Sequence, residues 1–128
     1  VSIEELPFNY SVINFINENC KKYTHIILIS GSYYKYVNSV ADYLDIFDSS
    51  IGTSITNNMI SSNKTNYLKN NFNNFIFDYI GDSKKDIPIW EESRKAFVVN
   101  RKNVAKYLSH IDYEIITHHD GNNDNQYQ

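Results

Sequence analysis

The chain has 128 residues, of which 41% are hydrophobic and 21% are charged, and its formal net charge at pH 7 is −3. This length allows one ordinary domain with a single core. The acidic balance argues against general nucleic-acid binding, which needs a basic surface. No apolar run reaches the ~20 residues that span a bilayer, and no signal-peptide pattern opens the chain. Cys20 is the single cysteine, so an internal disulfide is impossible, and we expect a cytoplasmic protein.

Short apolar runs alternate with segments whose apolar residues recur at helical spacing. The run from His25 to Ser30 has no polar alternation, which is typical of a strand buried on both faces. Gly31 and Ser32 break this run, and Ser32 is placed to cap the next helix. In chain order, the first predicted elements are a helix from Asn9 or Ser11 to about Lys22, a strand at 25–30, a helix at 36–44, a short strand or extended link at 46–52, and a helix from Ser61 or Ser62 through Phe72. These are followed by a strand at 74–80, a helix with Ile87, Ile89, Trp90 and Ala96 as candidate inward residues, a strand at 96–99, a short helix with Val104 and Leu108, and a last strand at 113–116.

The alternation of strands and helices predicts an α/β fold. We expect a Rossmann-like parallel sheet of four to five strands with helices on both faces. Residues 117–128 are polar, with glycine and repeated asparagine, and predict a disordered tail. Because ligands bind at the carboxyl ends of the strands in such sheets, the residues that follow the strands at 25–30 and 74–80 are the candidate site.

The segment 81–86 carries the sharpest local signal. Asp82 and Asp86 stand four residues apart where a predicted strand ends and a helix begins, so both carboxylates can face one point. Mg²⁺ takes oxygen ligands from one or two carboxylates and leaves its other positions to water and substrate phosphate. Gly81 would let the backbone turn sharply and approach closely. The alternative is structural: Asp82 or Ser83 caps the helix, and Asp86 favours its positive end.

A second signal follows the strand at 25–30. The hydroxyl of Ser30, followed by Gly31, can donate to a phosphate oxygen together with backbone amides at the start of the next helix. The alternative is a plain turn between a strand and a helix that is capped by Ser32. The order and spacing of the two signals favour the phosphate-binding interpretation of both.

The chain resembles haloacid dehalogenase (HAD)-type phosphatases of the phosphoserine phosphatase-like branch, and most of all the HAD domain that is fused to UbiA-type prenyltransferases. The resemblance covers roughly residues 6 to 116, as a partial domain. Four stretches carry it. Leu6 to Asn9 with His25 to Ser32 look like the family's second-motif region, and Val40 to Asp48 is similar to the helix that follows this motif. Phe77 to Trp90 looks like the fourth motif and its helix, and Arg94 to Asn100 resembles the next strand.

The resemblance implies an Mg²⁺-dependent phosphoryl transfer. In the family, an aspartate attacks the phosphate and forms an aspartyl-phosphate that water then hydrolyses, and Mg²⁺ offsets the charge of the phosphoryl group. Carried over to this sequence, Ser30 and Gly31 would bind the phosphate. Asp82 would bind Mg²⁺ directly or through water, and Asp86 would support it.

The sequence departs from the family pattern at two places. The family's first motif, Asp-x-Asp at the end of a central strand, occurs nowhere in this chain. Without that strand, we expect a slot between the strands at 25–30 and 75–80, which leaves backbone groups unpaired unless another segment fills it. The third-motif lysine is also replaced, because Ile60 stands at the best-fitting position. Lys64, one turn later, could reach back to the phosphate; the alternative is a solvated helix lysine.

Three functional interpretations remain open at this stage. In the first, the chain is a phosphohydrolase domain whose first-motif segment is missing and which is inactive by itself. In the second, it is a non-catalytic remnant that binds a phosphorylated ligand or a protein. In the third, it is one part of a split domain that another chain completes. A small phosphorylated molecule is the expected ligand in the first case. A partner that fills the missing strand, or self-association, is expected in the others. The sequence does not identify a substrate.

Overall fold

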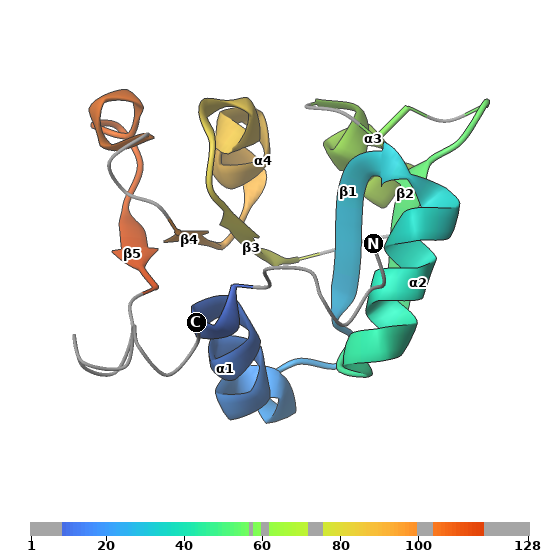
Figure 1. The fold of residues 1–128 in the computed structure, drawn as a ribbon. Coiled ribbons are helices and arrows are strands. Elements are labelled where there is room, and N and C mark those ends of the chain that lie inside the picture. The colour runs from blue at the N-terminus through green and yellow to red at the C-terminus, as the bar shows by residue number, and fades with distance from the viewer. Residues whose placement is uncertain (1–8, 57, 60–61, 72–75, 100–103, 117–128) are drawn as a thin grey trace. The chain divides into compact units, whose positions relative to one another are not determined.

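The computed structural model describes residues 9–56, 58–59, 62–71, 76–99 and 104–116 (Figure 1). The chain divides into two compact units, residues 1–63 and 64–128, and each unit is described by itself. The helices are α1 (Tyr10–Asn19), α2 (Tyr34–Leu44), α3 (Ser62–Asn71) and α4 (Ile87–Glu92), and the single 3₁₀ turns are η2 (Cys20–Lys22), η3 (Lys84–Asp86) and η4 (Ala105–Tyr107). The strands are β1 (Ile27–Tyr33), β2 (Ser49–Thr53), β3 (Asp78–Gly81), β4 (Lys95–Val98) and β5 (Tyr113–Ile115).

Helix α1 begins where the sequence offers an N-cap. The Asn9 side-chain oxygen accepts hydrogen bonds from the backbone N–H groups of Ser11, at 3.0 Å, and Val12, at 3.3 Å. These two donors have no partner inside the helix, and such a cap contributes about 1 kcal/mol. Asn9 is therefore the cap, and Ser11 is the second residue of the helix. The helix continues through η2 to Lys22, as predicted.

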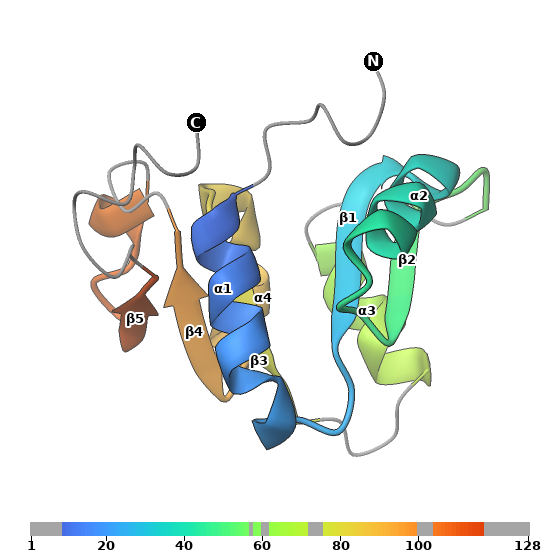
Figure 2. The same ribbon diagram turned by 60° about the horizontal axis from the view of Figure 1, so that its bottom comes forward.

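The first unit contains two parallel strands with α2 packed against them (Figure 2). Strand β1 runs through Gly31 and Ser32 to Tyr33, and α2 begins after Tyr33 without a side-chain cap, so the predicted break at Gly31 and the predicted Ser32 cap are both wrong. The apolar residues of β1 are only partly buried. The prediction of burial on both faces is therefore also wrong, because in the described residues β1 pairs with β2 alone.

Gly52 in β2 allows a close approach within this unit. A Cβ atom at this position would lie 2.5 Å from the Cα atom of Tyr34 and 2.9 Å from the carbonyl oxygen of Ser32. Real Cβ contacts are not this short, so only glycine fits where β2 passes the junction of β1 and α2.

The second unit contains three parallel strands in the order β3-β4-β5. Strand β4 lies in the centre and is the most buried, as an inner strand of a parallel sheet should be. At the start of the sheet, Arg94 donates two hydrogen bonds to the carboxylate of Asp78, at 2.9 and 2.6 Å. The Asp78 side chain is only 4% exposed. This bidentate pair links the beginning of β3 to the residue before β4.

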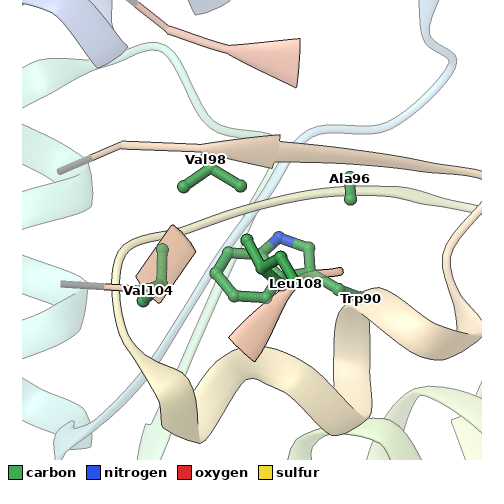
Figure 3. Close-up of a cluster of buried hydrophobic side chains, with 5 residues drawn as sticks. All are labelled: Trp90, Ala96, Val98, Val104 and Leu108. Atoms are coloured by element: carbon green, nitrogen blue, oxygen red, sulfur yellow. The ribbon is translucent and has the colours of Figure 1, made fainter. Parts of the chain in front are cut away.

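The core of the second unit is one cluster of buried side chains (Figure 3), and its members are Trp90, Ala96, Val98, Val104 and Leu108. The Trp90 indole N–H donates to the carbonyl oxygen of Phe97 at 3.3 Å, so its polar group is satisfied inside the core. The predicted inward positions of Ile89 and Trp90 are confirmed, since both are almost fully buried, while Ile87 is only partly buried. Ala96 is buried, but it lies in β4, so its predicted place on the helix is wrong.

The structure confirms the α/β class and the parallel pairing, but not the single sheet. The five described strands form one sheet of two strands and one of three, instead of one sheet of four to five. Strand β3 begins at Asp78, so the predicted strand at 74–80 is wrong for residues 76–77. The predicted helix end at Phe72, strand residues 74–75 and the tail at 117–128 lie outside the described residues. No helix in the described part of the chain is long and apolar enough to cross a membrane.

We expect Leu108→Ala to lower the free energy of unfolding of the second unit by about 2–5 kcal/mol, because it leaves a cavity in the cluster. Trp90 is the single tryptophan and lies in this cluster, so its fluorescence during urea unfolding reports on this unit. Ile115→Ala is the control, since Ile115 is 39% exposed and loses less buried area than Leu108, which is 1% exposed. Equal losses in the two variants would contradict this account of the core.

Candidate functional site

The turn after β3 is built by a capping box. Ser83 precedes η3, its hydroxyl oxygen accepts the N–H of Lys85 at 3.2 Å, and the Asp86 carboxylate accepts the N–H of Ser83 at 3.2 Å. Each residue thus satisfies a backbone donor that the start of a helix leaves free. The structural alternative of the sequence analysis is confirmed for Ser83, which is the cap, while Asp82 is not.

Both oxygens of the Asp86 carboxylate are hydrogen-bonded to the protein. Oδ2 accepts the N–H groups of Asp82, at 3.0 Å, and Ser83, and Oδ1 accepts the hydroxyl of Tyr79 at 2.9 Å. Asp86 is 8% exposed, and a carboxylate buried to this extent needs such partners. Three donors from β3 and from the turn therefore converge on one side chain and fix the backbone at residues 82 and 83.

Gly81 makes room for this carboxylate. A Cβ atom at residue 81 would lie 2.6 Å from Asp86 Oδ2 and 2.7 Å from Asp86 Cγ. The sequence analysis expected a close approach at Gly81, and the structure shows that the approaching group is the side chain of Asp86.

Lys64 reaches this network from α3. Its ammonium nitrogen donates to the Tyr79 hydroxyl at 3.3 Å and lies 6.0 Å from the centre of the Tyr79 ring. The hydroxyl in turn donates to Asp86, so Lys64, Tyr79 and Asp86 form a chain of hydrogen bonds. Lys64 thus belongs to this network, while its predicted role in binding a phosphate stays a prediction.

The Tyr79 hydroxyl is held in its protonated form. Burial raises the pKa of Tyr79 well above its usual range, and the neighbouring carboxylates of Asp86 and, less strongly, Asp82 raise this pKa further. At neutral pH the hydroxyl therefore always has a proton to donate to Asp86.

Asp82 differs from Asp86 in its surroundings. Its side chain is exposed, and no residue in the described ranges donates a hydrogen bond to its carboxylate. In those same ranges, no group of three or more His, Cys, Asp or Glu residues could hold a metal ion. One free carboxylate suits Mg²⁺, which keeps several waters and takes oxygens from a phosphate ligand. One exposed carboxylate at Asp82 is compatible with a hydrated Mg²⁺, and the metal-binding roles of Asp82 and Asp86 stay predictions.

Ser30 and Gly31 belong to the first unit. The Ser30 hydroxyl oxygen accepts the N–H of Ser32 at 3.1 Å, at the place where the register between β1 and β2 shifts. Gly31 is exposed. The structure therefore brings Lys64, Asp82 and Asp86 into one unit, while Ser30 and Gly31 lie in the other, and the phosphate-binding roles of Ser30 and Gly31 stay predictions.

Sequence reasoning missed Tyr79. Side chains alternate between the two faces of a strand, so Tyr79 and Gly81 share one face of β3, beside the turn that carries Asp86. The sequence did contain a signal for the role of Tyr79: a tyrosine stands two residues before Gly81, in a predicted strand that ends in carboxylates.

Comparisons of the chain with protein-family models, with curated protein sequences and with solved structures found no match. The function is therefore inferred from the residues of the site itself.

We expect Gly81→Ala to lower the free energy of unfolding of the second unit by about 1–3 kcal/mol, because the new methyl group displaces the Asp86 carboxylate. The control is a double-mutant cycle with Asp86→Ala, followed by Trp90 fluorescence. In the Asp86→Ala background the same glycine substitution should cost clearly less. Equal costs in both backgrounds would show that the two residues do not interact.

The raised pKa of Tyr79 predicts a dependence of stability on pH. Above pH ~10 an unfolded chain releases this phenolic proton while the folded chain keeps it, so the free energy of unfolding falls as the pH rises. Tyr79→Phe should remove at most about 1.4 kcal/mol per pH unit from this fall. Urea unfolding at pH 8 to 11 measures it, with Tyr67→Phe, in the same unit, as the control. A Tyr79→Phe profile that parallels the unsubstituted protein would contradict the prediction.

Proposed function

We propose that this chain is the metal-binding and phosphate-binding part of a HAD-type, Mg²⁺-dependent phosphohydrolase domain, and that it is inactive by itself. The observation that carries the proposal is the turn after β3. There, Asp82 presents a free carboxylate at the carboxyl end of a parallel strand, on a backbone fixed by Asp86 and Tyr79. This edge of a parallel sheet is where ligands bind. The resemblance of residues 77–90 to the family's fourth motif supports the same assignment.

The described side chains of the second unit have distinct roles in this proposal. Asp82 holds Mg²⁺, which supplies positive charge to the phosphoryl group when it is bound. Asp86 coordinates nothing directly, because both of its oxygens are engaged, and it holds the Asp82 backbone in place. Lys64 carries the positive charge that the family's third-motif lysine supplies, and Tyr79 positions its ammonium by accepting a hydrogen bond from it.

The nucleophile is the missing part. No Asp-x-Asp sequence occurs in the 128 residues, and without an attacking aspartate no aspartyl-phosphate can form. We propose that a strand outside these residues supplies it, either from the same protein or from another chain. Strand β3 has a free side for such a strand, since among the described strands it pairs only with β4.

A second candidate function is binding without catalysis. It is favoured by one observation: Ser83 and Asp86 form a capping box for which Gly81 leaves room, and this arrangement needs no metal. A remnant of this kind would keep the turn for folding, and its ligand would be a phosphorylated molecule or a protein partner.

A titration with Mg²⁺ followed by NMR tests metal binding at Asp82. We expect the amide signals of Asp82 and Ser83 to shift, because the ion adds charge next to their N–H groups. The shift should disappear in Asp82→Asn and persist in Asp112→Asn, which removes an exposed carboxylate of the same unit at the other end of the strands. Equal shifts in both variants, or none in the unsubstituted protein, would refute the metal site and favour the second candidate.

Hydrolysis of an aryl phosphate tests the missing nucleophile. The folded 128-residue chain should show no turnover with Mg²⁺ above the level of Asp82→Asn, because no aspartate of the chain matches the first motif. Turnover that a chelator and Asp82→Asn both abolish would mean that these residues already contain a nucleophile.

A further inference from the structure

Two lysines gather around one tyrosine in the second unit. The ammonium nitrogens of Lys84 and Lys106 lie 5.7 Å and 5.1 Å from the centre of the Tyr107 ring. Lys84 belongs to η3, which follows β3, and the other two residues belong to η4, which lies between β4 and β5. The contact therefore joins two segments that are distant in sequence. Both lysines are exposed, and Tyr107 is 36% exposed, so the cluster is open to solvent.

Within the described residues, no carboxylate balances the charges of this cluster. None lies within 4.0 Å of either ammonium group there, whereas Lys69 pairs with Glu92 and Arg94 pairs with Asp78. A cation over an aromatic ring at an exposed site gains about 0.5–1 kcal/mol. The chain as a whole is acidic, so this group of cations is a local feature. An anionic ligand would supply the negative charge that the described residues do not place beside these lysines.

The cluster also lies at the edge of the sheet where the candidate site is found. Parallel strands end at the same edge, and the segments that follow β3 and β4 carry Lys84 and Lys106 (Figure 1). Lys84 comes two residues after Asp82. A ligand whose phosphate is held at Asp82 through Mg²⁺ would therefore lie at the same edge of the sheet as these ammonium groups.

We propose that Lys84, Lys106 and Tyr107 form an anion-binding subsite for a second anionic group of the ligand. The ligand class is then an organic diphosphate or another phosphate ester with two anionic groups. The assignment of the ligand as a substrate rests on the proposed function, but the binding of an anion at the subsite does not. The two lysines supply the charge, and both ammonium groups lie beside the ring of Tyr107.

Titration with inorganic pyrophosphate, without metal and followed by NMR, tests the subsite. We expect the amide signals of Lys84, Lys106 and Tyr107 to shift, and pyrophosphate to bind more tightly than orthophosphate, since it carries more negative charge. Lys84→Gln and Lys106→Gln should each weaken binding by about 2- to 5-fold, as expected for exposed charge pairs. Lys95→Gln is the matched control, because Lys95 is an exposed lysine at the start of β4, at the opposite end of the strand.

Two results would overturn the proposal: an absence of shifts at these three residues, or an equal loss of affinity in Lys95→Gln, which would indicate a general response to anions. Asp82→Asn should not weaken the binding of pyrophosphate in the absence of metal, because it removes a negative charge. The anion titration and the Mg²⁺ titration thus fail independently. Loss of the Mg²⁺ response alone would refute the proposed function and leave the subsite in place.

Discussion

The carboxylate of Asp86 is the constraint on which the candidate site depends. It accepts three hydrogen bonds, from the Tyr79 hydroxyl and from the backbone N–H groups of Asp82 and Ser83, and it lies so close to residue 81 that only glycine fits there. Leaving even one of these donors unpaired in a buried place would cost about 1–3 kcal/mol. The end of β3, the turn and the start of η3 therefore have one mutually consistent arrangement, and Asp82 is placed by it without contributing its own side chain.

The core of the second unit also stabilises this arrangement, through the ring of Tyr79. The Tyr79 ring packs edge-on against Trp90, with 6.3 Å between the ring centres, and Trp90 is a member of the buried cluster. The hydroxyl of Tyr79 then connects the cluster to Asp86 and to Lys64. Packing and polar contacts are thus coupled through one residue, because its ring belongs to the apolar interior and its oxygen to the polar turn. A change in the cluster that moves Trp90 would therefore shift Tyr79 and alter its hydrogen bond to Asp86.

The parts of this structure that could be predicted from the sequence are those set by local physics. The Asn9 cap, the helices and strands of the second unit and the inward positions of Ile89 and Trp90 follow from spacing and capping chemistry. What failed depended on neighbours that a local pattern does not contain. The apolar run of β1 predicts burial on both faces, but burial depends on how many strands flank it, and the described residues supply one. The role of Tyr79 depends on contacts with Lys64, 15 residues earlier, and Asp86, which only the folded chain reveals.

The capping and metal-binding interpretations of residues 81–86 do not exclude each other. Gly81, Ser83 and Asp86 have structural work in the turn whether or not an ion binds, so their presence alone does not distinguish an active domain from a remnant. Because the turn is already held by the protein's own donors, an ion would bind a preformed backbone and would not have to order it. Asp82 is different, since its exposed carboxylate makes no hydrogen bond within the described residues. An exposed side chain without such contacts contributes little to stability, so folding does not require aspartate at this position. Folding therefore leaves the identity of residue 82 open, and the proposed metal binding is the role that would require an aspartate there.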